Sequence, residues 1–113
     1  MSKRKSNPFP TSALECFKAL GDPNRLSILR WMLAHEEACS VTEIAGKALA
    51  LDLSVVSRHL GTLRDAGLVK AERRGRQVFY KVDGAAIAKT LHTLAGTIEA
   101  CCVPNAAPER NAK

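Results

Sequence analysis

The sequence predicts a mainly α fold with a small β-hairpin, and three observations support this. Apolar residues recur at helical spacing along most of the 113-residue chain. Serine or aspartate precedes several of these stretches, where its side chain can cap a helix. Two β-prone runs, 68–72 and 78–82, flank a glycine-containing loop at 73–77, which is typical of a hairpin. A chain of this length is expected to form one domain with a single modest core.

The first two helices are predicted over residues 12–20 and 23–35. Ser12 and Glu15 have the spacing of a capping box at the start of the first helix. Asp22 is placed to cap the second helix, with a proline in its first turn. Apolar residues of the second helix form a wide stripe that indicates burial. The stripe consists of Leu26, Ile28, Leu29, Met32 and Leu33.

Two shorter helices are predicted next, separated by a turn at residues 50–53. Ser40-Val41-Thr42-Glu43 forms a second capping box, and Ser54 is placed to cap the following helix. Gly67 supplies a stop for that helix. Its apolar face consists of Val56, Leu60 and Leu63.

The last helix is predicted to begin after Asp83-Gly84 and to end before Pro104. Its apolar residues repeat at spacings of four, three and four, which gives a narrow seam suited to packing against another helix. That helix belongs either to the core of the same chain or to a second copy. The seam consists of Ile87, Leu91, Leu94 and Ile98.

Two short helices joined by a turn and followed by a hairpin define a winged helix-turn-helix. The domain is assigned to residues 11–103, between a flexible basic arm at 1–10 and a flexible tail at 104–113. In this fold the second short helix enters the DNA major groove, and residues near its start touch base edges. The alternative is an ordinary solvated helix face. The candidate DNA-binding residues on this helix are Ser54, Ser57, Arg58, His59 and Thr62.

The predicted hairpin tip adds three cations, Arg73, Arg74 and Arg76. A basic hairpin tip can lie along the DNA backbone or in the minor groove. Taken alone, such a charge run is more often a solvated loop. Directly after a helix-turn-helix, it favours phosphate contact, to which the basic arm could add nonspecific attraction.

Composition favours a nucleic-acid partner. Lys and Arg total 17 against 11 acidic residues, which gives a net charge of +6. Aromatic residues make up only 4%, which argues against a single-strand binder that stacks bases on exposed rings. There is no apolar run of membrane-spanning length and no signal-peptide pattern, so we expect a cytoplasmic protein that does not contact a membrane. No glycine-rich phosphate loop, triad or catalytic metal cluster is evident, so we do not expect an enzyme.

Four cysteines, Cys16, Cys39, Cys101 and Cys102, include no C-x-x-C pair. Cys101 and Cys102 are adjacent near the end of the last helix and offer two soft ligands. Cys101 continues the apolar seam and can also be read as a small apolar filler. Cys102 lies about 100° further round the helix and therefore outside the seam, so a role as apolar filler does not explain it.

Three segments resemble the ArsR/SmtB family of metalloregulatory repressors over roughly residues 12–100. They are residues 20–29 (LGDPNRLSIL), the pair 54–60 and 63–69 (SVVSRHL and LRDAGLV), and 74–80 (RGRQVFY). The resemblance implies a homodimer that pairs through its first and last helices. It also implies binding to double-stranded operator DNA without effector and release when a toxic metal or metalloid binds.

The chain departs from the family's known effector sites. Many arsenic-sensing members carry a Cys-Val-Cys box where this chain has Ser40 and Thr42, although Cys39 lies one residue earlier. Zinc-sensing members use paired His and carboxylates on the last helix, where His92 stands alone. Outside these effector sites, the chain departs from the family at Leu53, which occupies a position that is often polar in the family.

The cysteine pair resembles that of members that sense trivalent arsenicals near the C-terminus. Two thiols satisfy methylarsenite, whose third valence is filled by carbon, whereas arsenite would want a third sulfur. Antimonite is a further candidate effector. Cys16 is the better candidate for a third ligand and Cys39 the weaker one. Two alternatives stay open: a redox-responsive repressor that uses the pair as a thiol switch, and a winged-helix protein-interaction module.

Overall fold

The computed structural model of the chain describes residues 11–46 and 51–102, so the predicted arm at 1–10 and tail at 104–113 lie outside the described residues. The described part is mainly helical with a small antiparallel sheet, as predicted. Its elements are α1 (Thr11–Leu20), α2 (Pro23–Leu33), β1 (Cys39–Ser40), α3 (Val41–Ile44), α4 (Leu53–Asp65), β2 (Val69–Arg74), β3 (Gln77–Val82) and α5 (Gly84–Cys102).

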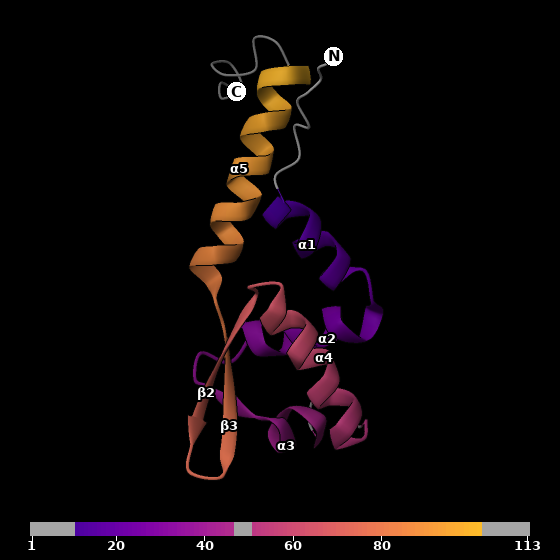
Figure 1. The fold of residues 1–113 in the computed structure, drawn as a ribbon, viewed down its shortest axis with the longest axis vertical. Helices are drawn as coiled ribbons and strands as arrows, with labels where there is room; N and C mark the ends of the chain where they lie inside the picture. Colours follow the sequence, from indigo (N-terminus) through magenta and orange to yellow (C-terminus); the bar gives the residue numbers. More distant parts are fainter. Residues whose placement is uncertain (1–10, 47–50, 103–113) are drawn as a thin grey trace.

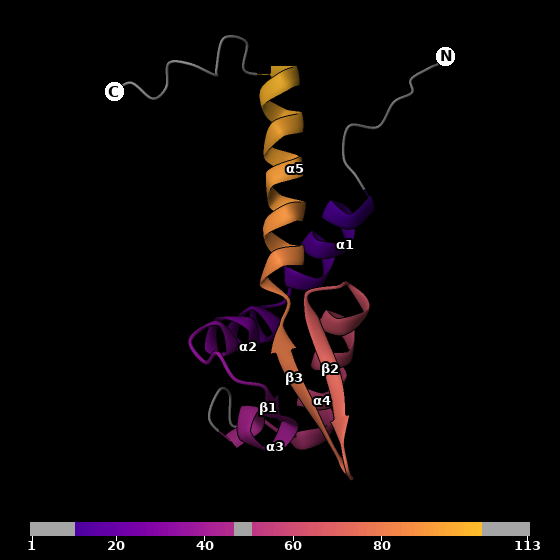
Figure 2. The same cartoon turned by 90° about the vertical axis from the view of Figure 1, so that its left-hand side faces the viewer.

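The molecule is elongated, with its two candidate sites at opposite ends. Helices α2, α3 and α4 and the sheet form the body, and α5 rises away from it with α1 beside its first half (Figure 1, Figure 2). The β2–β3 hairpin projects at the other end of the body. The end of α5 and the tip of the hairpin therefore lie far apart.

The core is built around one face of α4. Val56, Leu60 and Leu63 are completely buried, as their spacing predicts. They belong to one cluster with Ile28 of α2 and Ile44 of α3. Each fully buried aliphatic side chain contributes about 1.5–3 kcal/mol relative to exposure. This packing holds the helix-turn-helix against the rest of the domain.

Two of the predicted helix caps are confirmed. The Asp22 carboxylate accepts backbone hydrogen bonds from Asn24 and Arg25, at 2.8 and 3.2 Å. Ser40 Oγ accepts from the Glu43 amide at 3.2 Å, and Glu43 Oε1 accepts from the Ser40 amide at 2.9 Å. Both caps satisfy amide groups that have no partner within their own helix.

The caps predicted at Ser12 and Ser54 are wrong. Helix α1 begins at Thr11, so Ser12 lies inside its first turn. Helix α4 begins at Leu53, because the Val56 amide already donates to the Asp52 carbonyl at 3.0 Å. Asp52 therefore takes the capping position, although its side chain makes no capping hydrogen bond, and Ser54 is helical.

The hairpin is confirmed, but its loop is shorter than predicted. Arg74 pairs with Gln77, so Gly75 and Arg76 alone form the turn and Arg73 and Arg74 belong to β2. Gly75 adopts a φ of +65°, a conformation that glycine reaches without steric cost. A third strand, β1, pairs with β3 to give the order β1-β3-β2. Only two residues long, β1 has too little alternation to be recognised from sequence.

Replacing Ser40 with alanine should lower the free energy of unfolding by about 1 kcal/mol, because it removes a capping oxygen. The Ser12→Ala variant is the matched control. Ser12 is exposed within a helix, so its replacement should change stability by less than about 0.5 kcal/mol. Urea denaturation followed by circular dichroism measures both. An equal loss in the two variants would contradict the assigned caps.

Candidate nucleic-acid interface and thiol pair

The face of α4 opposite the core is available to a partner. Ser54, Ser57 and Arg58 are exposed there. Thr62, one turn further along, is half-buried and donates its hydroxyl to the Arg58 carbonyl at 3.2 Å. The first two turns of α4 therefore present hydroxyl and guanidinium groups, which can bond to base edges and to phosphates.

His59 differs from the other predicted residues because it has a partner within the protein. Its Nδ1 lies 3.4 Å from Nη1 of Arg25 on α2. The same guanidinium donates from Nε to the Ala19 carbonyl at 2.6 Å, and its Nη2 lies 3.4 Å from the Lys18 carbonyl. Arg25 thus joins the end of α1 to α4. The sequence alone does not predict this role of Arg25, because the spacing of residues does not reveal contacts between distant segments.

The β2–β3 hairpin, called the wing below, places its two neighbouring arginines on opposite faces of the sheet. Arg74 is paired with Glu72 at 3.2 Å, and its guanidinium carbon lies 4.7 Å from the centre of the Phe79 ring. Alternation along the strand puts Arg73 on the opposite face, the one that carries the buried Tyr80. Arg76 lies in the exposed turn. The Glu72 carboxylate therefore already neutralises Arg74, which makes Arg74 a weaker candidate for a phosphate contact.

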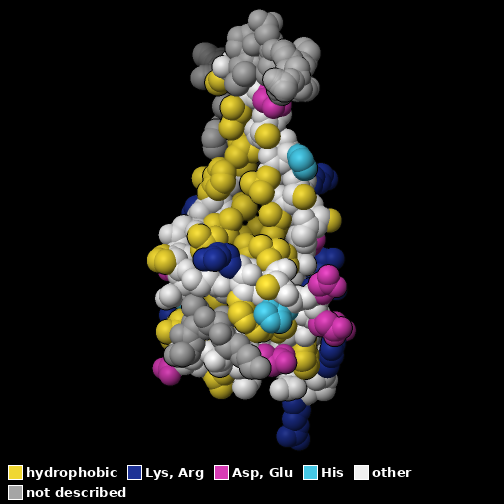
Figure 3. Space-filling model, turned by 180° about the vertical axis from the view of Figure 1, so that it is seen from behind, with side chains coloured by type: hydrophobic (Ala, Val, Ile, Leu, Met, Phe, Trp, Pro, Cys, Tyr) yellow, Lys and Arg dark blue, Asp and Glu magenta, His cyan; other side chains and the backbone are white. Residues whose placement is uncertain are grey.

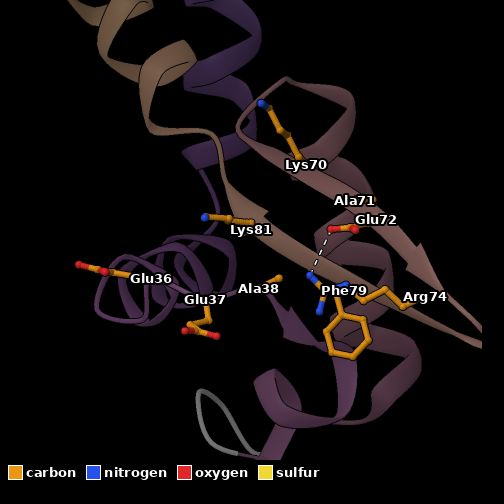
Figure 4. Close-up of a pocket in the computed structure, with 9 residues that line it drawn as sticks. All are labelled: Glu36, Glu37, Ala38, Lys70, Ala71, Glu72, Arg74, Phe79 and Lys81. Atoms are coloured by element: carbon orange, nitrogen blue, oxygen red, sulfur yellow. Dashed lines mark hydrogen bonds and ion pairs between the residues drawn. The ribbon is translucent and has the colours of Figure 1, made fainter.

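A hollow of about 530 Å³ lies on the outer face of the sheet (Figure 4). Three acidic and three basic side chains line it, so its formal charge balances and it does not suit a polyanion. The dashed line in Figure 4 marks the Glu72–Arg74 pair that crosses part of it. The charged lining residues are Glu36, Glu37, Glu72, Lys70, Arg74 and Lys81.

The structure brings Cys101 and Cys102 together at the end of α5. Their sulfurs are 2.8 Å apart and both side chains are exposed. The hydrogen bond with Cys101 raises the pKa of the Cys102 thiol. One soft atom can therefore bridge the two sulfurs from solvent without a change in the core.

The other two cysteines are buried away from solvent. Cys16 and Cys39 both belong to the core cluster, and burial raises the pKa of each thiol. Cys39 also donates its thiol proton to the Glu37 carbonyl, at 3.4 Å. Within residues 11–46 and 51–102, no three His, Cys, Asp or Glu side chains gather closely enough to hold a metal ion. One chain therefore does not bring Cys16 or Cys39 to the exposed pair.

The apolar seam of α5 is only partly covered by its own chain. Ile87 packs against the core and Leu94 is buried, whereas Leu91 and Ile98 are 45% and 42% exposed. Helix α1, which contacts α5, adds two more exposed apolar side chains, Leu14 and Phe17. Figure 3, which shows the molecule from behind, has apolar side chains gathered in the middle and upward along the tall part of the molecule. We call Leu14, Phe17, Leu91 and Ile98 the α1–α5 apolar face.

Comparison with known proteins agrees with this architecture. A helix-turn-helix domain family matches residues 20–72. The regulator YbzH of Bacillus subtilis, an uncharacterised HTH-type transcriptional regulator, is 38% identical over 89 residues, which cover 67% of this chain and 88% of YbzH.

Two solved structures share the fold. The ArsR-like transcriptional regulator from Rhodococcus sp. RHA1 is 29% identical, with a TM-score of 0.65 over 75% of this chain and 77% of that one. The homodimeric winged helix-turn-helix DNA-binding domain from Mycobacterium bovis is 25% identical, with a TM-score of 0.59 over 79% and 82%.

The fold and these matches define a DNA-binding protein of the winged helix-turn-helix class. The chain belongs to the ArsR/SmtB family of transcriptional regulators. In the part of the chain that the structure describes, no helix has the length and apolarity needed to cross a bilayer.

The four thiols should react in two classes. Cys101 and Cys102 are exposed and should be modified rapidly by a disulfide reagent such as DTNB, whereas the buried Cys16 and Cys39 should react only after unfolding. Because a neighbour raises the pKa of Cys102 and the thiolate is the reactive form, the rapid phase should accelerate as the pH rises above neutral.

Stopped-flow absorbance of the folded protein, followed by addition of guanidinium chloride, counts both classes. A Cys101→Ser, Cys102→Ser variant should lose the rapid phase alone. Rapid reaction of all four thiols in the folded protein would contradict the placement of Cys16 and Cys39 in the core.

Proposed function

We propose that this protein is a cytoplasmic, homodimeric repressor that a trivalent arsenical releases from its operator by binding to Cys101 and Cys102. The observation that carries the proposal is the pair of exposed sulfurs, 2.8 Å apart, at the end of a helix that leaves an apolar face uncovered. Methylarsenite is the preferred effector, followed by arsenite and antimonite.

The α1–α5 apolar face supports pairing of two copies. Leu91 and Ile98 lie on the same side of α5 as Leu94, because they are spaced by three and four residues. A contiguous apolar surface of this kind marks a protein interface. The homodimeric Mycobacterium bovis domain has the same fold, and a homodimer would cover this face in both copies.

The balance of atoms favours methylarsenite for a two-thiol site. Methylarsenite carries one methyl group and two hydroxyls on As(III). Two arsenic–oxygen bonds break and two arsenic–sulfur bonds form, while the two thiol protons leave in two water molecules. No oxidant or reductant is needed, and arsenic keeps its three-coordinate state. Arsenite reacts in the same way but retains one hydroxyl, because Cys16 and Cys39 are buried in the core.

The DNA-binding surface combines the start of α4 with the wing. In a symmetric dimer the two recognition helices enter successive major grooves, with half-sites about 34 Å apart. Ser54, Ser57 and Arg58 would reach bases and phosphates, and Arg73 and Arg76 would reach the backbone beside them. In this arrangement His59 would lie near the DNA. Its contact with Arg25 would also help to fix the orientation of α4.

Release follows from linkage between the two sites. An arsenical lowers operator affinity only if it binds the DNA-incompetent dimer more tightly. A bridge between two neighbouring sulfurs constrains the last turn of α5, which continues directly from the α1–α5 apolar face. A shift of that face changes the spacing of the two recognition helices and so their match to the half-sites.

Fluorescence anisotropy on labelled DNA from upstream of the protein's own gene tests the effector. Methylarsenite should release the wild type at stoichiometric concentrations, and the Cys101→Ser, Cys102→Ser variant should stay bound. The matched controls are Cys16→Ala and Cys39→Ala, which keep the exposed pair and should still respond to methylarsenite. A loss of the arsenite response alone in Cys16→Ala would show that Cys16 supplies a third ligand in the assembled dimer.

Other outcomes would replace this effector. Release by peroxide without any arsenical would favour the thiol switch, and release by zinc a metal site of another composition. An unchanged arsenical response in the double serine variant would contradict the assigned site. DNA binding that is weak and insensitive to salt would favour a protein-interaction module over a repressor.

The wing should show an asymmetry between its two neighbouring arginines. Arg73→Ala should weaken operator binding and reduce the slope of log Kd against log salt by about 2, as expected for one lost phosphate contact in each protomer of the dimer. Arg74→Ala should have a smaller effect, because Glu72 already neutralises Arg74. Lys89→Ala, an exposed cation on the side of α5 away from the seam, is the control and should not change the slope. A larger effect of Arg74 than of Arg73 would overturn the proposed orientation of the wing.

A further inference from the structure

Leu53 is an exposed leucine at the start of the proposed recognition helix. It is the first residue of α4 and is 52% exposed, whereas the other leucines of that helix, Leu60 and Leu63, are completely buried. The core therefore does not account for Leu53. Leu53 is therefore available to contact a partner that meets the start of α4.

Within residues 11–46 and 51–102, the other large exposed apolar side chains lie elsewhere. Four form the α1–α5 apolar face, and Leu26 and Leu33 lie on α2. Leu53 stands apart from all of them on α4, so pairing of two copies through the α1–α5 apolar face does not explain it.

The neighbours of Leu53 are the side chains proposed to contact DNA. Ser54 follows it directly, and Ser57 lies one turn along the same side of the helix. Residues at the start of a recognition helix are the ones that reach base edges in the major groove. Docking of α4 through Ser54 and Ser57 would therefore carry Leu53 into the groove with them.

The major groove offers an apolar side chain one distinctive target. Of the four bases, only thymine presents a methyl group there, and the other base edges offer hydrogen-bond donors and acceptors. A leucine side chain has neither donor nor acceptor, so it gains most by burying that methyl. We propose that Leu53 reads the 5-methyl group of a thymine in each operator half-site, an inference that rests on the proposed DNA-binding function.

The size of the effect follows from the burial of one methyl group. Removing that contact should raise Kd by about fourfold per half-site, or about sixteenfold when both half-sites of a dimer are changed. Leu53 would thus set sequence preference at one position, while the arginines supply most of the affinity.

Replacing thymine by deoxyuridine tests this directly, because it removes only the methyl group and keeps the base pairing. After footprinting defines the operator, each thymine of the half-sites is replaced in turn and Kd is measured by anisotropy. For the wild-type protein, the replacement should raise Kd about fourfold at one position in each half-site. Leu53→Ser should bind the two DNAs equally at that position.

The Leu33→Ser variant is the control, because Leu33 is 61% exposed but is the last residue of α2 and not part of α4. It should keep the wild-type response to deoxyuridine, and circular dichroism should show all three proteins folded. An operator with no methyl-sensitive thymine in wild type would overturn the proposal, as would equal sensitivity in wild type and Leu53→Ser. Failure of wild type to bind any upstream DNA would instead overturn the proposed function itself.

Discussion

One face of α4 is completely buried, and this burial determines how the candidate DNA-binding surface is presented. Val56, Leu60 and Leu63 have no exposed surface, so the helix cannot rotate about its axis without exposing apolar groups to water. This fixed rotation is what turns Ser57 and Arg58 outward. The surface offered to DNA is therefore a consequence of how the core packs, and a change in the core would alter DNA binding without touching a DNA contact.

A second set of contacts relates this helix to the thiol end of the molecule. Helix α5, which ends in the exposed sulfurs, contacts α1, which lies beside its first half (Figure 1, Figure 2). The last carbonyls of α1 accept hydrogen bonds from Arg25, whose guanidinium also meets His59 of α4. Packed helices and this one arginine thus give a continuous physical connection between Cys102 and the recognition helix. The proposed repressor uses it as the route from effector to operator.

Local signals in the sequence predicted much of the fold, and contacts between distant segments accounted for most of what was missed. The spacing of apolar residues identified the buried face of α4, and the caps at Asp22 and Ser40 were found because each involves residues two or three positions apart. Ser12 and Ser54 lie inside the first turns of their helices and not at the caps, because serine tolerates a position inside the first turn as well as the cap. The strand pairing of Cys39 with Tyr80 spans more than a third of the chain and has no local signature.

The same difference between local signals and long-range contacts applies to the candidate sites. The adjacency of the two exposed thiols is visible in the sequence, whereas the burial of Cys16 and Cys39 depends on the tertiary packing of helices and strands. The wing was predicted as a run of equivalent cations. The structure distinguishes them, because strand register sends Arg74 toward Glu72 and Phe79 and Arg73 to the other face.

The proposed repressor requires energetic coupling between the thiol pair and the DNA-binding surface, and such coupling is reciprocal. Isothermal titration of methylarsenite into the free protein and into its operator complex gives two affinities for the arsenical. If the sites are coupled, the arsenical should bind the complex more weakly, by the same factor by which it weakens operator binding. Equal affinity for the free protein and the complex would show that the two sites are not coupled, even if both exist.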